Sequence, residues 1–316
     1  MKRVFIIFAV LMFFVLMFFV TALFVVACKN APMTKADIEV YIISSPSGTK
    51  ENPVQLSLNG FDLGDMRSKD CGWFSLLDAI EAAEKFVSLD LSGCTMITEI
   101  FNHRTGYVGK DKIVSLVLPD AATVILRPGP AYREFINVKY VQGSNISFLG
   151  WCAVQSWESL ESADFPKLTS TGHSAFEYCG NFNIASLPEG LTYLAELSFL
   201  GCRSLTLTSI PEGVTGIGFS AFENCIALEE MTLPAALTSL GAYVFKGCTN
   251  LRKVTINAVA PPKVDGGSAY YMIEPGKWGM FVNTHPGLEI KVPAGSVQAY
   301  KEAEGWREYA DRISAM

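Results

Sequence analysis

Charged residues are scarce in this sequence, and histidines are scarcer still. Only 18% of the 316 residues are charged, and the three histidines, His103, His173 and His285, lie far apart. They form no metal-ligand spacing, and no nucleophile stands near a base in a catalytic pattern. The 31 acidic residues outnumber the 25 basic ones, which argues against a nucleic-acid partner because nucleic acid requires a Lys- and Arg-rich face. The residues predict no metal, no cofactor and no enzyme.

One long apolar run stands at the N-terminus. After Lys2 and Arg3, only Thr21 interrupts the apolar residues up to Ala27. A basic start, an apolar stretch and a small residue before a polar segment indicate an export signal over 1–27. The run is also long enough to span a bilayer, so an uncleaved transmembrane anchor stays open as an alternative. Either way, we expect the rest of the chain outside the cytoplasm.

The residues VVAC, ending at Cys28, resemble the lipobox of bacterial lipoproteins. The resemblance implies a signal peptide of the lipoprotein type, lipid attachment at Cys28, and a lipid-anchored tether over 28–35. It places the protein at the bacterial outer membrane or cell surface. The periplasmic face of a membrane is the alternative location.

A repeat of 23 residues fills the second half of the chain. Cys179, Cys202, Cys225 and Cys248 are 23 positions apart, within a shared pattern AFxxCxxLxxVxLPxxLTxIG. Its strand-like end can be traced upstream, which predicts about eight units over 86–262. An N-terminal cap over 36–85 and a C-terminal cap over 263–316 would cover the open ends.

Each unit contains one expected strand. The LxxVxL segment turns two apolar side chains to one face, and the next proline ends the strand. The LTxIG segment is expected to turn the chain, with Gly172, Gly218 and Gly241 available for positive φ. Stacked units then predict one curved parallel sheet.

The units look like the leucine-rich repeats of BspA-like (Treponema pallidum-type) bacterial surface proteins. The resemblance implies an α/β solenoid, a right-handed coil with a concave parallel β-sheet and caps at both ends. It also implies adhesion to host proteins or to other bacteria. Trp157 at a cysteine position and Thr208 at an apolar strand position depart from the pattern.

Residues between the apolar strand positions are expected to face solvent. We call seven of them on the expected concave face the exposed strand row; Ile184 and Leu207 would be exposed aliphatics beside it. Either the face is merely solvated, or it binds a partner broadly and weakly. The row consists of Asp164, Ser186, Ser209, Glu230, Thr232, Lys253 and Thr255.

The four periodic cysteines are expected to stack as free, buried thiols. Parallel Cβ vectors suit stacking better than bridging, and a buried cysteine behaves as a small hydrophobe. Whether Cys71 and Cys94 pair stays open. We call Cys179, Cys202, Cys225 and Cys248 the cysteine column.

Both ends carry further elements. Residues 73–87 predict a helix, and IEVYII and VQLSLNGFDL, within 38–63, predict two β-like runs. Near the C-terminus, LEIKVP predicts a last strand. One or two short helices follow it, and Gly305 is expected to break them.

These observations lead to a functional expectation. The chain is expected to be a non-catalytic cell-surface lipoprotein that binds macromolecules, as an adhesin or host-interaction protein. Its partner would be a host extracellular-matrix protein or another bacterial surface protein, with membrane contact through the lipid. A periplasmic structural or scaffolding lipoprotein is the alternative.

Overall fold

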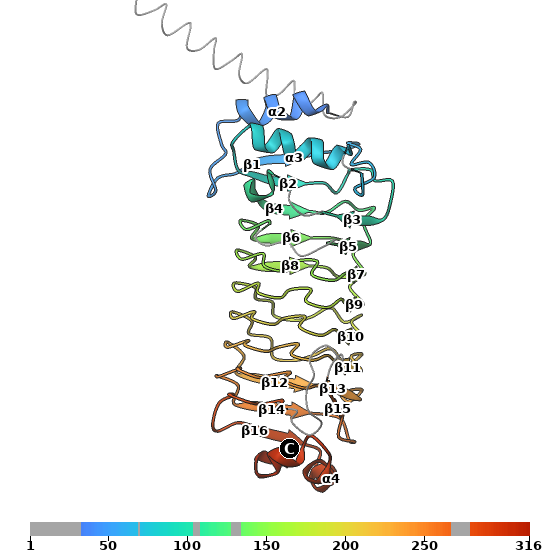
Figure 1. Ribbon diagram of the computed structural model, residues 1–316, viewed down its shortest axis with the longest axis vertical. Helices are drawn as coiled ribbons and strands as arrows, with labels where there is room; N and C mark the ends of the chain where they lie inside the picture. The colour runs from blue at the N-terminus through green and yellow to red at the C-terminus, as the bar shows by residue number, and fades with distance from the viewer. Residues whose placement is uncertain (1–32, 69, 104–107, 128–133, 267–278) are drawn as a thin grey trace, which may run out of the picture.

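The chain coils into a parallel-sheet solenoid of about nine turns, with little helix. A computed structural model describes residues 33–68, 70–103, 108–127, 134–266 and 279–316. The expected signal peptide, the alternative transmembrane anchor, Cys28 and most of the tether lie outside these residues. The solenoid of the predicted fold class is confirmed, and Figure 1 shows two ladders of strands along its length.

One ladder consists of two sheets, separated by two turns without regular strands. The N-terminal sheet has the order β1-β2-β4-β6-β8, and the C-terminal sheet the order β12-β14-β16-β17. The N-terminal strands are β1 (Val54–Ser57), β2 (Val87–Asp90), β4 (Ile113–Val117), β6 (Tyr140–Gln142) and β8 (Ser162–Asp164). The C-terminal strands are β12 (Glu230–Leu233), β14 (Lys253–Ile256), β16 (Glu289–Val292) and β17 (Ile313–Ala315). The predicted single sheet is therefore divided.

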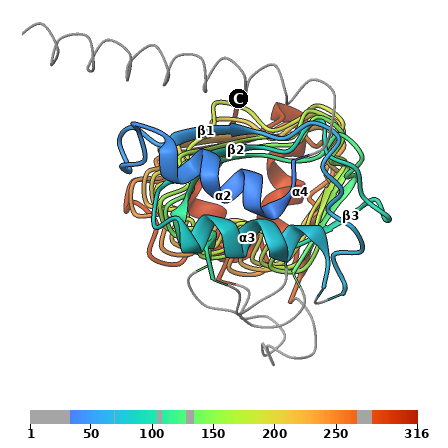
Figure 2. The same ribbon diagram turned by 90° about the horizontal axis from the view of Figure 1, so that it is seen from above.

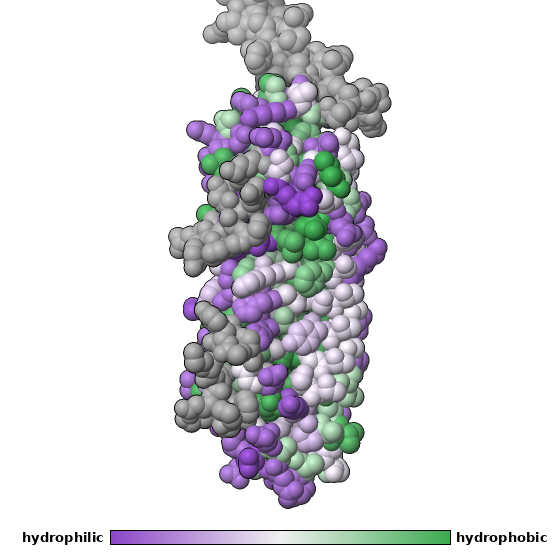
Figure 3. All heavy atoms as spheres, turned by 45° about the vertical axis from the view of Figure 1, so that its right-hand side comes forward, coloured by the Kyte–Doolittle hydropathy of each residue, from purple (hydrophilic) through white to green (hydrophobic). Residues whose placement is uncertain are grey.

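The second ladder is one continuous sheet of eight strands, which we call the long sheet. It is built largely from the LTxIG segments that the sequence predicts as turns. Polar and apolar side chains are mixed over this side of the molecule (Figure 3). Its strands are β3 (Ile100–Asn102), β5 (Val124–Leu126), β7 (Phe148–Leu149), β9 (Ser170–Thr171), β10 (Tyr193–Leu194), β11 (Gly216–Ile217), β13 (Ser239–Gly241) and β15 (Lys263–Asp265).

The glycines of the LTxIG segments do not adopt positive φ, contrary to the prediction. They allow close stacking instead: a Cβ on Gly218 would lie 2.5 Å from the Glu196 amide nitrogen. Positive φ occurs two residues later, at non-glycine residues such as Ser174 (58°) and Ser220 (50°). The repeat thus uses glycine to bring backbones together rather than to reach the left-handed region.

Aromatic rings form a column inside the coil. Phe199 stacks between Phe176 and Phe222, with ring centroids 5.3 and 5.4 Å apart and planes within 5° of parallel. Phe245 and Phe281 continue the column at 5.6 and 5.8 Å. Since each turn stacks the same ring on its neighbour, the turns share one core that none could bury alone.

Two helices cover the N-terminal end of the coil, α2 (Lys35–Ser44) and α3 (Gly72–Ala82) (Figure 2). The helix predicted at 73–87 is confirmed only as far as Ala82, since Val87 begins β2, and the β-like interpretation of IEVYII is wrong. Thr34 and Asp37 form a capping box, and Ile38 and Ile42 share the buried face of α2. The N-terminal cap and the four-residue spacing of Ile38 and Ile42 favour a helix, and they outweigh the β-branched composition, which favours a strand. The predicted strand in VQLSLNGFDL is confirmed as β1.

The C-terminal end is closed by the strand predicted in LEIKVP, which is β16, and by short helices. This strand is not the last one, because β17 follows the helices and pairs with β16. These helices are η3 (Ala294–Ser296), α4 (Val297–Glu302) and η4 (Arg307–Arg312). Gly305, at φ 79°, separates α4 from η4 as predicted. Tyr300 donates to the Ala258 carbonyl at 2.8 Å and Trp306 to the Pro262 carbonyl at 2.8 Å. Both bonds fasten the cap to the last repeat.

Candidate functional site

The C-terminal half of the exposed strand row forms an ordered polar surface on β12 and β14. Glu230 pairs in register with Lys253, and Thr232 with Thr255. The Glu230 carboxylate and the Lys253 Nζ lie 3.1 Å apart, with side chains 60% and 43% exposed. An exposed ion pair of this kind contributes under about 1 kcal/mol to stability. These charges are therefore available to a partner at little cost to the fold.

The polar surface continues onto β16. Lys253 is in register with Glu289, and Thr255 with Lys291. The Lys291 ammonium lies 3.1 Å from the Glu289 carboxylate and also donates to the Ser314 hydroxyl at 3.1 Å. Charges thus alternate across three neighbouring strands. We call Glu230, Thr232, Lys253, Thr255, Glu289 and Lys291 the polar ladder.

The other members of the exposed strand row lie apart from the polar ladder. Ser209 makes an isolated bridge to Thr232, at the edge of the C-terminal sheet. Ser186 belongs to no strand, and Asp164 ends β8 on the far side of the interruption. The structure brings Asp164 and Ser186 together, but at a different feature, a cleft between two turns.

The interruption of the ladder has a local cause in the sequence. Phe182 and Ile184 are two residues apart and both turn inward, so Ala185 and Ser186 face solvent before Leu187 returns to the core. The next turn repeats this arrangement with Leu207, only 1% exposed. The expectation that Ile184 and Leu207 are exposed aliphatics is therefore wrong. An FxIxxL spacing cannot continue the LxxVxL register of the regular turns.

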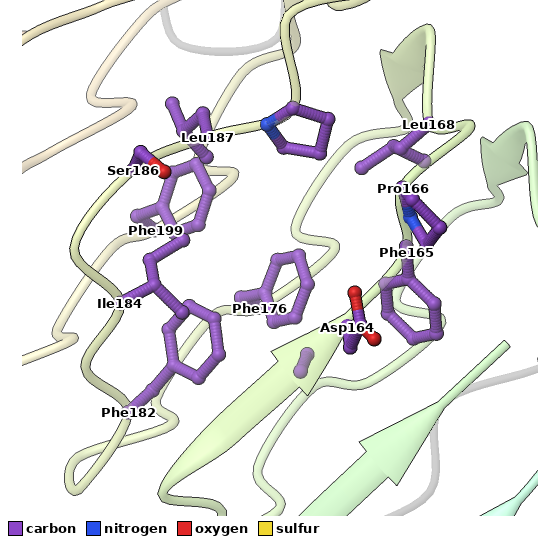
Figure 4. Close-up of a pocket in the computed structure, with 12 residues that line it drawn as sticks. Asp164, Phe165, Pro166, Leu168, Phe176, Phe182, Ile184, Ser186, Leu187 and Phe199 are labelled. Atoms are coloured by element: carbon purple, nitrogen blue, oxygen red, sulfur yellow. The ribbon is translucent and has the colours of Figure 1, made fainter. Parts of the chain in front are cut away.

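A cleft of about 190 Å³ opens beside this interruption. Figure 4 shows that its two sides come from successive turns, with Phe165 and Leu168 on one side and Ile184 and Leu187 on the other. Phe176, a ring of the aromatic column, lies between them. Asp164 and Ser186 are the polar side chains of its lining.

The structure places the cysteine column inside the coil, with every member fully buried and unbridged. Each thiol donates to a carbonyl of the preceding turn; for Cys225 the acceptor is Phe199, at 3.1 Å. Burial raises the pKa of the Cys179 and Cys248 thiols to about 12, so both stay protonated at neutral pH. Cys71 and Cys94 are also buried, free thiols. These positions indicate packing rather than thiolate chemistry.

A buried charged cluster lies in the early turns of the coil. Lys110 is 2% exposed, in η1 (Lys110–Lys112), and its Nζ lies 2.9 Å from the Glu134 carboxylate. The same carboxylate is 3.4 Å from His103 Nδ1, and His103 Nε2 lies 2.9 Å from the Ala153 carbonyl oxygen. No periodicity connects these residues, so nothing in the sequence could have found the cluster.

Burial and the contacts within the cluster shift the pKa values of its members. Burial would raise the pKa of Glu134, but the adjacent His103 side chain and the nearby Lys110 ammonium lower it to about 2. Burial lowers the pKa of both His103 and Lys110. The carboxylate therefore stays charged and compensates the buried Lys110 ammonium.

Two kinds of feature are absent from the described part of the chain. None of the described helices is long and apolar enough to cross a membrane. Likewise, residues 33–316, apart from the undescribed gaps, hold no group of three or more His, Cys, Asp or Glu side chains that could bind a metal ion.

Comparison with known proteins identifies the repeats. Residues 112–260 match the BspA-type leucine-rich repeat region in six copies. Such repeats generally mediate protein–protein binding, and proteins of this type are generally non-enzymatic. The comparison with curated proteins gives no significant match.

Solved bacterial structures also resemble the chain. A leucine-rich repeat protein of T. pallidum is 20% identical, with a TM-score of 0.39 over 58% of this chain and 88% of its own. A leucine-rich cell surface protein of Faecalibacterium prausnitzii is 17% identical, with a TM-score of 0.34 over 68% and 82%. A leucine-rich repeat protein of Bacteroides ovatus is also 17% identical, with a TM-score of 0.29 over 73% and 75%.

Proposed function

Because residues 112–260 match the BspA-type leucine-rich repeat region, we propose that this chain is a non-catalytic surface protein of that type that binds other proteins. It acts as an adhesin or host-interaction protein, and its partner is a host extracellular-matrix protein or another bacterial surface protein. The VVAC sequence supports export and attachment to the outer membrane or cell surface through a lipid on Cys28.

The observation that carries the binding proposal is the polar ladder. Its charges alternate in register across β12, β14 and β16, on strands whose backbones are fixed by parallel pairing. Because the strands are already ordered, little conformational entropy is lost when a partner docks. Alternating charges also favour one orientation of a partner over others.

A charge exchange tests this surface. The double variant Glu230→Arg with Lys253→Glu keeps an internal ion pair but reverses both charges. Because both side chains are exposed and stay paired, the exchange should leave the fold intact, as measured by circular dichroism. Binding to immobilised matrix proteins and bacterial surface proteins should fall about tenfold or more, as expected when charges oppose across an interface.

A matched control exists at the other end of the molecule. Lys35 and Asp78 form an ion pair of 3.4 Å, also about half exposed, between α2 and α3. The exchange Lys35→Asp with Asp78→Lys should leave binding unchanged. Equal binding by both exchange variants and the parent protein would remove the polar ladder as the site.

Cellular location separates the proposal from its alternative, a periplasmic scaffolding lipoprotein. Protease added to intact cells should cut the protein if it is on the surface and spare a periplasmic protein of the same cells. Complete protection, together with cleavage after outer-membrane permeabilisation, would support the scaffolding alternative.

A further inference from the structure

The cleft beside Asp164 is an apolar cavity of ligand size at a defect in the coil. Its volume of about 190 Å³ exceeds that of an engineered cavity of about 150 Å³ that accepts benzene. The walls are mainly aromatic and aliphatic, contributed by two successive turns and the aromatic column (Figure 4). The space therefore suits one aromatic or large aliphatic side chain.

The cavity exists because one inward position is occupied by a small residue. Met231 and Val254 fill the middle of their strands in the C-terminal sheet, with 1% and no exposure. Ala163 holds the corresponding place in β8 and lines the cleft. The next turn adds Ile184 from a shifted register and does not restore the missing volume.

Backbone hydrogen-bonding groups also face this gap. In β8, the Ser162 N–H and the Asp164 carbonyl bond to the preceding turn. In a parallel ladder the residue between them directs its N–H and carbonyl to the opposite edge, so those of Ala163 point toward the interruption. Asn183 donates to the Glu161 carbonyl at 2.9 Å, and among the described residues no strand pairing follows at 184–187.

A negative charge stands at the mouth of the cleft. Asp164 is exposed, and no hydrogen bond or ion pair of its carboxylate occurs among the residues that the structure describes. An apolar pocket with a few convergent polar groups is the usual form of a binding site. The charge favours a cation next to the apolar group of the ligand.

We propose that this cleft receives an aromatic or large aliphatic side chain of a partner protein, presented on an extended segment with a neighbouring Lys or Arg. The side chain fills the cavity, the segment's backbone bonds to Ala163, and the cation pairs with Asp164. Combining main-chain bonding at a strand edge with a side-chain pocket is a known mode of peptide recognition. The inference rests on the proposed protein-binding function but not on the polar ladder.

Short blocked peptides test the inference on the full chain. The probe is acetyl-Gly-Phe-Lys-Gly-amide, with Ala replacing Phe in one control peptide and Glu replacing Lys in another. Binding is followed by the methyl NMR signals of Ile184, Leu168 and Leu187. The probe should shift these signals, and each control peptide should bind about tenfold or more weakly.

Three variants test the specificity of the site. Ala163→Leu fills the cavity and should weaken probe binding about tenfold or more, whereas Ala185→Leu, on the exposed side of the same interruption, should not. Asp164→Asn should weaken the lysine peptide and leave the glutamate peptide unchanged or slightly stronger. Ala163→Leu should fold normally because Met and Val occupy the equivalent place in later turns.

Several results would overturn the inference. These are equal binding of the Phe and Ala peptides, unchanged binding by Ala163→Leu, or saturation of the cleft by toluene with no further gain from the peptide. The last would identify a small apolar molecule as the occupant. If the probe binds but no protein partner does, the proposed function is wrong and this inference stands. If a protein partner binds both the parent and the Ala163→Leu variant while the probe does not bind, this inference is wrong and the proposed function stands.

Discussion

Replacing Gly241 by alanine should destabilise the coil, because there is no space for a Cβ between two of its turns. A Cβ on Gly241 would lie 2.3 Å from both the Gly218 carbonyl carbon and the Phe219 amide nitrogen, whereas ordinary contact begins at 3.4 Å. Both neighbours are backbone atoms, which cannot rotate away as a side chain can. The two turns would have to separate by about 1 Å.

The cost follows from the hydrogen bonds that such a separation breaks. Strands β11 and β13 are paired in register there, and the adjacent Thr238 N–H donates to the Thr215 carbonyl at 2.9 Å. A bond of that length loses its strength when it is lengthened by about 1 Å. Two or three lost bonds at about 1 kcal/mol each, with overpacking of the core, give a destabilisation of about 3 kcal/mol.

Urea unfolding followed by circular dichroism measures this change. Gly180→Ala is the matched control, since a Cβ there meets no atom within 4 Å, and its effect should stay within about 0.5 kcal/mol. Ala195 occupies the position that Gly218 and Gly241 hold in the next two turns. Its N–H bonds to the Thr171 hydroxyl at 3.1 Å, whereas the Gly218 N–H bonds to the Leu194 carbonyl at 2.8 Å. A loss below about 1 kcal/mol for Gly241→Ala, or an equal loss for Gly180→Ala, would refute the close-stacking argument.

Three further predictions follow from other parts of the chain. Cys28→Ser should abolish incorporation of labelled palmitate; label retained by the variant would support the uncleaved transmembrane anchor. The cysteine column should react with a thiol reagent much more slowly than the half-buried Cys152, and rapid labelling of all four cysteines in the native protein would contradict their burial. Cys225→Asp should lower the free energy of unfolding by about 3–5 kcal/mol, because a carboxylate would face the Phe199 carbonyl in a dry core. Glu134→Gln should cost about 3–5 kcal/mol by removing the carboxylate that compensates Lys110, and it should weaken the acid dependence of stability. In the folded parent protein Glu134 has a pKa of about 2, below its usual value of 4.5. The contribution of the Glu134 carboxylate to the free energy of unfolding is therefore present above pH 4.5 and is lost as the pH falls from there toward 2.

The repeat and its core could be derived from the sequence because the same short pattern recurs at a fixed interval. The interval of 23 residues predicts stacked turns, and the cysteine and phenylalanine positions lie in columns inside the coil. Local signals were also sufficient for α3, for β16 and for the break at Gly305. Periodicity works here because each turn contacts only its neighbours, so a local pattern repeats as a local environment.

The sequence alone indicates the interruption of the strand ladder only in part. The apolar spacing of Phe182, Ile184 and Leu187 stands in the sequence, but it aligns without a gap to the regular units. Alignment by length assigned Ile184 to the wrong face, because a strand inverts every side chain when its register slips by one residue. The cleft depends on that inversion together with Ala163 in the turn before.

The sequence by itself determined the solenoid, its approximate number of turns, the columns of buried residues and the positions of the exposed charges on β12 and β14. The tertiary structure alone decided which glycines serve close stacking, how His103, Lys110 and Glu134 come together, and where a cavity remains. The physical reason is the range of the interactions. Repeating contacts between adjacent turns are written in the spacing of the chain, whereas cavities and buried charge clusters depend on side-chain volumes and directions from residues that no fixed interval relates.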